Sequence, residues 1–105
     1  QAIALKPEYA DAHYSLGAML LQASRPAEAE RSLREAVRLG VDARYASEAH
    51  NLLGASLAQR GRIREALPEF ETAVRIDVRN HNAARNAATA RQALAIQSGP
   101  ETPAR

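Results

Sequence analysis

The sequence contains no cysteine and few aromatic residues, and both shortages narrow the range of possible folds. Without cysteine there is neither a disulfide framework nor a cysteine-ligated metal site. Aromatic residues make up 4% of the chain and apolar residues 46%, with alanine abundant among them. Strands favour β-branched and aromatic side chains, whereas alanine favours helices. The composition therefore predicts an all-α fold of closely packed helices.

Long apolar runs and a strong charge of one sign are also missing. No apolar stretch approaches the roughly 20 residues that span a bilayer, so we expect no membrane insertion. The formal net charge is only +2, so no strong attraction to nucleic acid follows from it. The chain begins at Gln1 without a signal-like segment, and we interpret it as a piece of a longer protein. This leaves the cellular compartment open, with the cytoplasm favoured.

Motifs for catalysis or cofactor binding are absent from the sequence. There is no nucleophile paired with a base at a suggestive spacing, no glycine-rich phosphate loop and no HExxH metal motif. His13 and His50 allow a paired-histidine metal site as one interpretation. Packing of each histidine within its own hairpin is favoured, because no cysteine or nearby carboxylate completes a tetrahedral set. We therefore expect no enzyme activity, no cofactor and no metal, and an exposed His81.

Apolar residues recur at helical spacing on both sides of Gly61. Leu53 and Leu57 precede it, and Ala66 and Phe70 follow it. Glycine can adopt the left-handed conformation that ends a helix. This stretch therefore predicts two antiparallel helices joined by a short turn.

The same pattern occurs twice, displaced by 37 residues. The matching positions are Leu16-Gly17 with Leu53-Gly54, Glu28-Ala29 with Glu65-Ala66, Leu33 with Phe70, and Ala36 with Ala73. Small residues at these positions let two helices approach closely.

This pattern resembles the tetratricopeptide repeat, at Leu53-Gly54, Leu57, Gly61, Glu65-Ala66, Phe70 and Ala73. Val78 replaces the closing proline of that family, and His50 replaces its opening aromatic residue. The family repeat is 34 residues long, so about three residues are extra, and we place them between residues 40 and 50. The resemblance implies a superhelical solenoid of antiparallel hairpins that binds a protein or peptide.

Under this interpretation the chain divides into five parts. Residues 1–7 are the tail of a preceding repeat, 8–41 and 42–79 are two repeats, 80–97 are a capping helix and 98–105 are a disordered tail. The predicted helices cover about residues 9–23, 26–39, 43–60, 62–77 and 80–97, after a helical stub at residues 1–5. Asp42 and Asn80 are the expected N-caps, and Pro68 should cause a mild kink or a delayed helix start.

Each predicted helix has an inward-facing set of residues. We expect Leu16, Gly17 and Leu20 in the first helix, Ala29, Leu33 and Ala36 in the second, and Ala84, Ala87, Ala88, Arg91 and Leu94 in the last. Arginine and glutamate interleave on what we expect to be a solvated face: Glu28, Glu30, Arg31, Arg34, Glu35 and Arg38, then Arg62, Arg64 and Glu65. A nucleic-acid patch is less favoured, because acidic residues alternate with the arginines and stacking aromatics are lacking.

The resemblance implies that the ligand lies on the concave face lined by the first helix of each hairpin. The candidate groove residues lie one step away from the packing positions. They are Asp11, Tyr14, Ser15, Ala18 and Gln22, then Glu48, Asn51, Leu52, Ala55 and Gln59, and finally Asn82, Arg85, Asn86, Thr89 and Gln92. Asparagine and glutamine each offer a donor and an acceptor, as a peptide bond does. The alternative is that these are ordinary exposed helix positions.

The expected function is a non-catalytic scaffold module of a larger protein that binds a protein or extended peptide. One alternative is a C-terminal accessory or regulatory region of a larger enzyme such as a transferase, and nucleic-acid binding is a third possibility. Since Ala2, Ile3 and Leu5 only partly cover the first helix, we also expect self-association through the N-terminal end.

Overall fold

The computed structural model describes residues 7–98, which form five α-helices and no strand. The helices are α1 (Pro7–Gln22), α2 (Pro26–Leu39), α3 (Ala43–Gln59), α4 (Ile63–Ile76) and α5 (His81–Ser98). The all-α prediction is therefore confirmed. The predicted stub at residues 1–5 and the tail at 99–105 lie outside the described residues.

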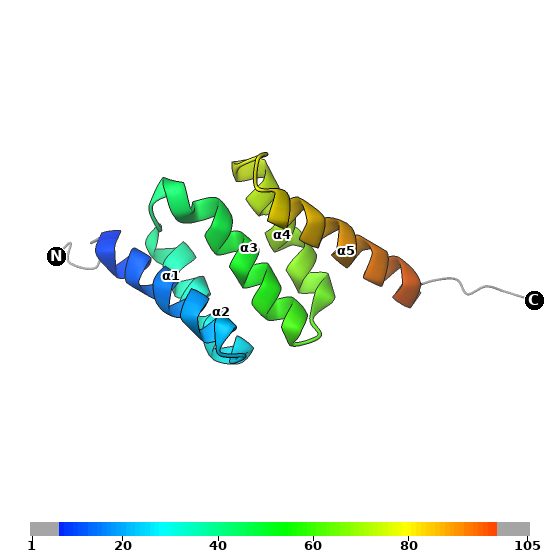
Figure 1. Ribbon diagram of the computed structural model, residues 1–105, viewed down its shortest axis with the longest axis horizontal. Helices are drawn as coiled ribbons and strands as arrows, with labels where there is room; N and C mark the ends of the chain where they lie inside the picture. Colours follow the sequence, from blue (N-terminus) through cyan, green and yellow to red (C-terminus); the bar gives the residue numbers. More distant parts are fainter. Residues whose placement is uncertain (1–6, 99–105) are drawn as a thin grey trace, which may run out of the picture.

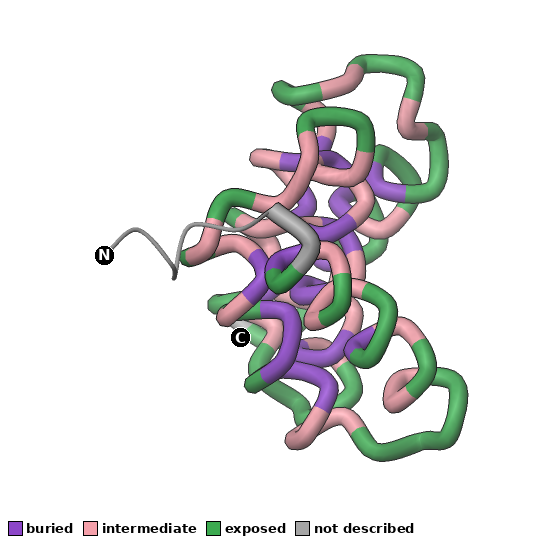
Figure 2. The backbone as a smooth tube through the Cα atoms, turned by 90° about the vertical axis from the view of Figure 1, so that its left-hand side faces the viewer, coloured by how far each residue is buried: buried purple, intermediate pink, exposed green. Residues whose placement is uncertain are grey.

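The helices form a stack of antiparallel hairpins (Figure 1). α1 pairs with α2 and α3 pairs with α4, while α5 packs on α4. α1, α3 and α5 lie side by side and run in nearly the same direction (Figure 1), and α3 contacts both of the others. Buried residues follow the middle of the stack between the helices (Figure 2). The helices are therefore arranged as successive hairpins along one axis, the order expected for a solenoid.

Close helix crossing depends on two glycines at equivalent positions. A Cβ on Gly17 would lie 2.5 Å from Leu33 Cγ, and a Cβ on Gly54 would lie 2.6 Å from Phe70 Cε1. Real carbon atoms do not approach so closely. Leu33 and Phe70 therefore each pack directly against the backbone of the facing helix, and both are buried.

The starts of α3 and α5 follow capping residues of the sequence. The Asp42 side chain accepts a hydrogen bond from the Arg44 backbone N–H at 3.0 Å, and Asn80 Oδ1 accepts one from the Ala83 N–H at 3.1 Å. Both predicted N-caps are confirmed. α4 begins at Ile63, so the delayed start was wrong; the helix continues through Pro68, which is exposed.

Two predicted inward faces were partly wrong, although Gly17 and Ala87 are buried as predicted and Leu20 packs against the core. In α5 the buried residues are Ala83, Ala87 and Ala90, whereas Ala84, Ala88 and Arg91 are exposed. The seam with α4 therefore follows the i, i+4, i+7 stripe that begins one residue earlier. In α1, Leu16 is 42% exposed rather than packed inward.

The exposure of Leu16 follows from its position in the stack. Its counterpart in α3 is Leu53, which is buried because α2 packs on that side of α3. Its counterpart in α5 is Ala87, which is buried where α5 packs on α4. Among residues 7–98 no further helix packs on this side of α1, which includes Met19, 63% exposed.

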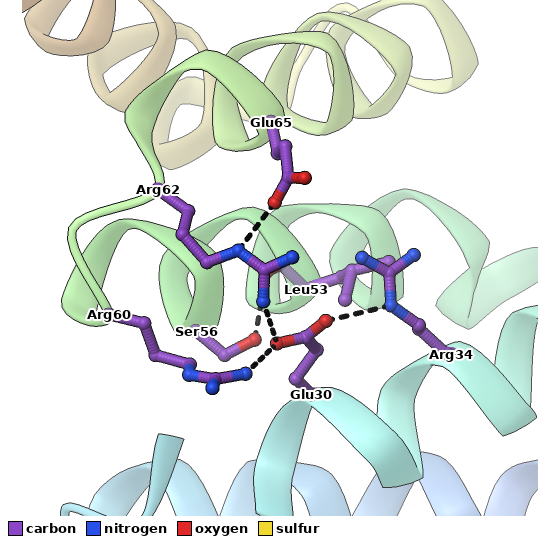
Figure 3. A network of polar contacts seen from close by, with 7 residues as sticks. All are labelled: Glu30, Arg34, Leu53, Ser56, Arg60, Arg62 and Glu65. Carbon is purple, nitrogen blue, oxygen red and sulfur yellow. Dashed lines mark hydrogen bonds and ion pairs between the residues drawn. The ribbon is translucent and has the colours of Figure 1, made fainter. Parts of the chain in front are cut away.

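Glu30 joins the two hairpins and was wrongly assigned to a solvated face. Glu30 Oε2 accepts a hydrogen bond from Arg34 Nε at 2.9 Å, and Oε1 accepts one from Arg60 Nη1 at 2.6 Å. Arg62 Nη1 lies 3.5 Å from the same Oε1 (Figure 3). The Glu30 side chain is only 9% exposed. Arg60 and Arg62 flank the turn between α3 and α4, so this carboxylate links α2 to the next hairpin.

The arginines determine the protonation of this buried carboxyl group. Burial alone raises the pKa of Glu30. Hydrogen bonds from Arg34 and Arg60, with the charges of Arg34 and Arg62, outweigh burial and hold the pKa below its ordinary value of 4.5. Glu30 is therefore ionised at neutral pH.

Candidate functional site

The predicted groove residues lie on α1, α3 and α5, the three helices that run side by side (Figure 1). Ala18, Leu52 and Ala55 are half-buried. The more exposed positions are Ser15, Gln22, Gln59, Asn82, Arg85, Thr89 and Gln92. These three helices thus present small and aliphatic side chains together with polar ones.

Aromatic stacking connects the first two of these helices. The rings of Tyr14 and Tyr45 are stacked with centroids 5.1 Å apart and an interplanar angle of 21°. Burial, then the charge of Glu48 and the neighbouring Tyr45, raises the pKa of the Tyr14 hydroxyl. Asp11 Oδ1 accepts a hydrogen bond from the Asp42 backbone N–H at 3.3 Å. Tyr45 was not among the predicted groove residues, although it lies in the segment where extra residues were expected.

A polar network connects α3 with α5. Asn51 is buried and its Nδ2 donates to both carboxylate oxygens of Glu48 at 3.3 Å. Asn86 Nδ2 donates to Asn51 Oδ1 at 2.9 Å. Asn80 Nδ2 donates to Glu48 Oε1 at 3.2 Å and to Ser47 Oγ at 2.9 Å. The structure therefore brings three of the predicted groove residues into one chain of hydrogen bonds, and Asn80 and Ser47 extend it.

The hydrogen bond from Asn86 to Asn51 fixes the orientation of the Asn86 amide. Since Nδ2 donates inward, Oδ1 is the remaining acceptor of this half-buried side chain. Within residues 7–98 no group donates a hydrogen bond to that oxygen. Elsewhere on α5, Arg85 Nη2 donates to Asn82 Oδ1 at 2.6 Å.

A small cavity lies between α3, α4 and α5 and has a volume of about 110 Å³. Its lining consists of Ala58, Ala90 and Ala93, the larger Ile63 and Phe70, and the polar Asn86 and Thr89. Only Asn86 and Thr89 were predicted site residues. Phe70 was assigned to the packing positions of its hairpin, and the other lining residues were assigned to no face, because the sequence periodicity gives no sign of an opening between three helices.

The three histidines lie in different surroundings. His50 Nδ1 lies 2.8 Å from Glu69 Oε1, across the hairpin of α3 and α4, so one carboxylate does lie beside this histidine, which was not foreseen from the sequence. His13 is half-buried and His81 is exposed. In the part of the chain that the structure describes, no three His, Asp or Glu side chains are grouped closely enough to hold a metal ion. Nor is any helix in that part long and apolar enough to cross a membrane.

A family model described as "Tetratricopeptide repeat" matches residues 1–43 and, overlapping with these, residues 20–81. No curated protein matches the chain. The matched residues include both hairpins of the structure, α1 with α2 and α3 with α4.

Proposed function

Because this chain belongs to the tetratricopeptide repeat family, whose repeats generally mediate protein–protein interaction, we propose that it is a non-catalytic scaffold module that binds an extended peptide segment of a partner protein. The ligand lies across α1, α3 and α5, in the groove defined by the predicted residues on these helices. Repeats of this kind are typically scaffolds rather than enzymes.

The observation that carries this proposal is the orientation of Asn86. Its Nδ2 is held by Asn51, and its Oδ1 is an acceptor without a donor in the described residues. An extended peptide presents backbone N–H groups that need acceptors. An amide held in place before binding loses little side-chain entropy when the peptide arrives.

Charge along the groove favours a ligand of mixed polarity. Asp11 and Glu48 are acidic residues on α1 and α3, whereas Arg85 is a basic residue on α5. A peptide with a basic residue toward α1 and an acidic residue toward Arg85 would complement this distribution. Opposite charges of this kind set orientation and association rate more than affinity.

Selection from a displayed library of random peptides on the immobilised protein tests the proposal. We expect enriched peptides whose affinity falls about tenfold in Asn86→Ala, the size expected when one hydrogen bond is lost. Gln97→Ala is the matched control, since it removes an exposed amide from the same helix outside the groove. Thermal unfolding of both variants would separate lost binding from lost folding. Absence of any enriched peptide, or equal binding by Asn86→Ala, would contradict the proposal.

A second proposal, self-association, is favoured by the exposed side of α1. Tyr9, Leu16 and Met19 are exposed, and together with Ala12 they recur at three- and four-residue spacing. This spacing places apolar side chains along one stripe that two copies can present to each other. Between Ala12 and Ser24, α1 and its end carry no aspartate, glutamate, lysine or arginine that would oppose the pairing.

Sedimentation velocity at several protein concentrations tests the association. We expect a concentration-dependent dimer that Met19→Glu abolishes, because a charge would be buried in the shared stripe. Val78→Glu is the control, since Val78 is also exposed, at 75%, but lies between α4 and α5. A monomeric mass at the highest concentration would contradict this second proposal.

A further inference from the structure

The cavity between α3, α4 and α5 corresponds to a place that the first hairpin fills with leucine. The internal repeat aligns Ala58 with Leu21 and Phe70 with Leu33. Leu21 and Ala58 both pack against the core cluster, but the smaller Ala58 also lines the cavity. The second hairpin thus lacks most of a large aliphatic side chain at this place, and a space of about 110 Å³ is left.

The size and lining of the cavity limit what can enter it. An apolar cavity of about 150 Å³ is known to admit a benzene molecule. A volume of about 110 Å³ is smaller and suits a branched aliphatic side chain better than an aromatic ring. The lining contains no charged residue, and the buried Phe70 and Ala90 contribute to it. An uncharged apolar group is therefore the complementary occupant.

Two polar side chains of the lining belong to the proposed peptide groove. Asn86 and Thr89 line the cavity and are also groove positions on α5. The unpaired Oδ1 of Asn86 can accept a backbone N–H from a peptide whose side chain enters the cavity. One residue of a ligand would therefore donate its backbone N–H to Asn86 Oδ1 and place its side chain in the cavity.

We propose that this cavity is the anchor pocket for a leucine, isoleucine or valine side chain of the bound peptide. The inference rests on the proposed function of the groove and names the side chain that determines its specificity. Replacing the anchor residue of a bound peptide by alanine is expected to weaken binding about 10- to 100-fold. Aspartate or lysine at that position is expected to abolish binding, because the pocket offers no charged partner.

NMR titration with N-acetyl-leucine-N′-methylamide tests the pocket without a full peptide ligand. We expect chemical-shift changes at the methyl groups of Ala58, Ala90 and Ala93 and at the side-chain amide of Asn86. The glycine analogue of the same probe has no side chain to insert and should leave these signals unchanged. Equal shifts with both probes, or shifts elsewhere only, would overturn the inference.

A filled-pocket variant provides the second test. Ala58→Leu restores the residue that the first hairpin has at this place, and filling the cavity should maintain or raise the thermal midpoint. It should abolish the leucine-probe shifts. Ala43→Leu is the matched control, with the same change at an exposed position of α3 outside the pocket, and should keep them. Probe shifts that persist in Ala58→Leu would contradict the pocket.

Peptide selection separates the failure of this inference from that of the proposed function. If wild-type protein enriches peptides with a fixed aliphatic position and Ala58→Leu loses that preference, the anchor is supported. If peptides are enriched without an aliphatic position, groove binding stands and the anchor is wrong. If no peptide is enriched, the proposed function fails, and with it the anchor, even where the leucine probe still enters the cavity.

Discussion

Ser24 and Gly61 occupy equivalent positions in the two hairpin turns, and both have a positive φ. Only Gly61 is suited to this left-handed conformation. Ser24 has φ 62° and Gly61 has φ 79°. The following residues make equivalent hydrogen bonds, from Arg25 N–H to the Leu20 carbonyl and from Arg62 N–H to the Leu57 carbonyl, both at 2.9 Å. A side chain in the left-handed region costs about 1–2 kcal/mol relative to the right-handed one. The first turn therefore carries strain that the second does not.

We predict that Ser24→Gly stabilises the protein by about 1 kcal/mol or somewhat less. Relief of the left-handed strain exceeds the extra flexibility that glycine gives the unfolded chain. Urea-induced unfolding measures the difference. Gly61→Ser is the reciprocal control and should destabilise by a similar amount; a lower unfolding midpoint for Ser24→Gly would contradict the strain.

Glu30 is the charged residue whose neighbours come from two hairpins. We predict that Glu30→Gln destabilises the protein by about 1–3 kcal/mol, because charge-assisted hydrogen bonds to Arg34 and Arg60 are lost. Glu35→Gln is the matched control on the same helix. Glu35 pairs with Arg38 at an exposed position, where solvent screens the pair, so its loss should change stability far less than the loss of Glu30.

The lowered pKa of Glu30 also predicts how the stability of the protein depends on pH. The pKa of Glu30 is lower in the folded protein than its ordinary value of 4.5. Its contribution is therefore present above that value and is lost as the pH falls through the folded-state pKa. Denaturant unfolding across the acid range should show wild type losing more stability than Glu30→Gln. Parallel pH profiles would contradict this role. Glu35 and Asp77 also have lowered pKa values, and both residues are present in wild type and in Glu30→Gln. The difference in unfolding free energy between these two proteins at each pH is therefore the relevant measure.

Sequence periodicity predicted core residues well where apolar residues alternate with charged ones. Ala29, Leu33 and Ala36 alternate with charged residues in α2, and all three are fully buried. Glu30 was mispredicted because its local spacing to Arg34 also fits an ordinary exposed pair. Nothing in α2 alone indicates that Arg60 and Arg62 approach from the next hairpin, since that contact depends on how hairpins stack.

Helix starts were predictable because their signals are local. Asp42 and Asn80 are short polar residues that satisfy free backbone N–H groups in the first turn, whatever the tertiary contacts. The face of α5 was not predictable in the same way. Alanines occupy both its exposed and its buried sides, so periodicity offers no contrast in size or polarity. The packing of α5 on α4 decided which stripe became buried.

At the level of the helix, we predict that Asn80→Ala loosens α5 and destabilises the protein by about 1–2 kcal/mol. The variant loses the N-cap bond to Ala83 and the bonds to Ser47 and Glu48. Hydrogen exchange should rise first in the amides of α5. Asn82→Ala, at an exposed position two residues later, serves as the control. Unchanged exchange in α5 would contradict the importance of the cap.

Across the whole molecule, the number of neighbouring helices predicts the order of local stability. α3 contacts all four other helices, whereas α5 packs mainly on α4 with a smaller contact to α3. The seam of α5 is built from Ala83, Ala87 and Ala90, which bury little area compared with Leu or Phe. Native-state hydrogen exchange should therefore show the slowest amides in α3 and much faster ones in α5. Equal protection of both helices would contradict this order.

The overall arrangement could be predicted from the repeat, whereas the cavity could not. Two copies of one pattern displaced by 37 residues indicate stacked hairpins, and Gly17 and Gly54 mark the crossings. The cavity arises where three helices leave a space at Ala58, and no single segment encodes it. Alignment of Ala58 with Leu21 shows that a large side chain is missing there, but whether a space results depends on how α5 packs.

The weak alanine seam of α5 has one more consequence. Asn86, Thr89, Ala90 and Ala93 lie on this helix, so one wall of the anchor pocket belongs to the helix that we expect to be less protected than α3. A ligand side chain bound in the pocket would dissociate whenever α5 unfolds locally. Its binding would in turn stabilise the folded state of α5 by mass action. Ligand binding and local unfolding of α5 are then coupled. A more tightly packed seam between α4 and α5 would slow the dissociation of the bound peptide.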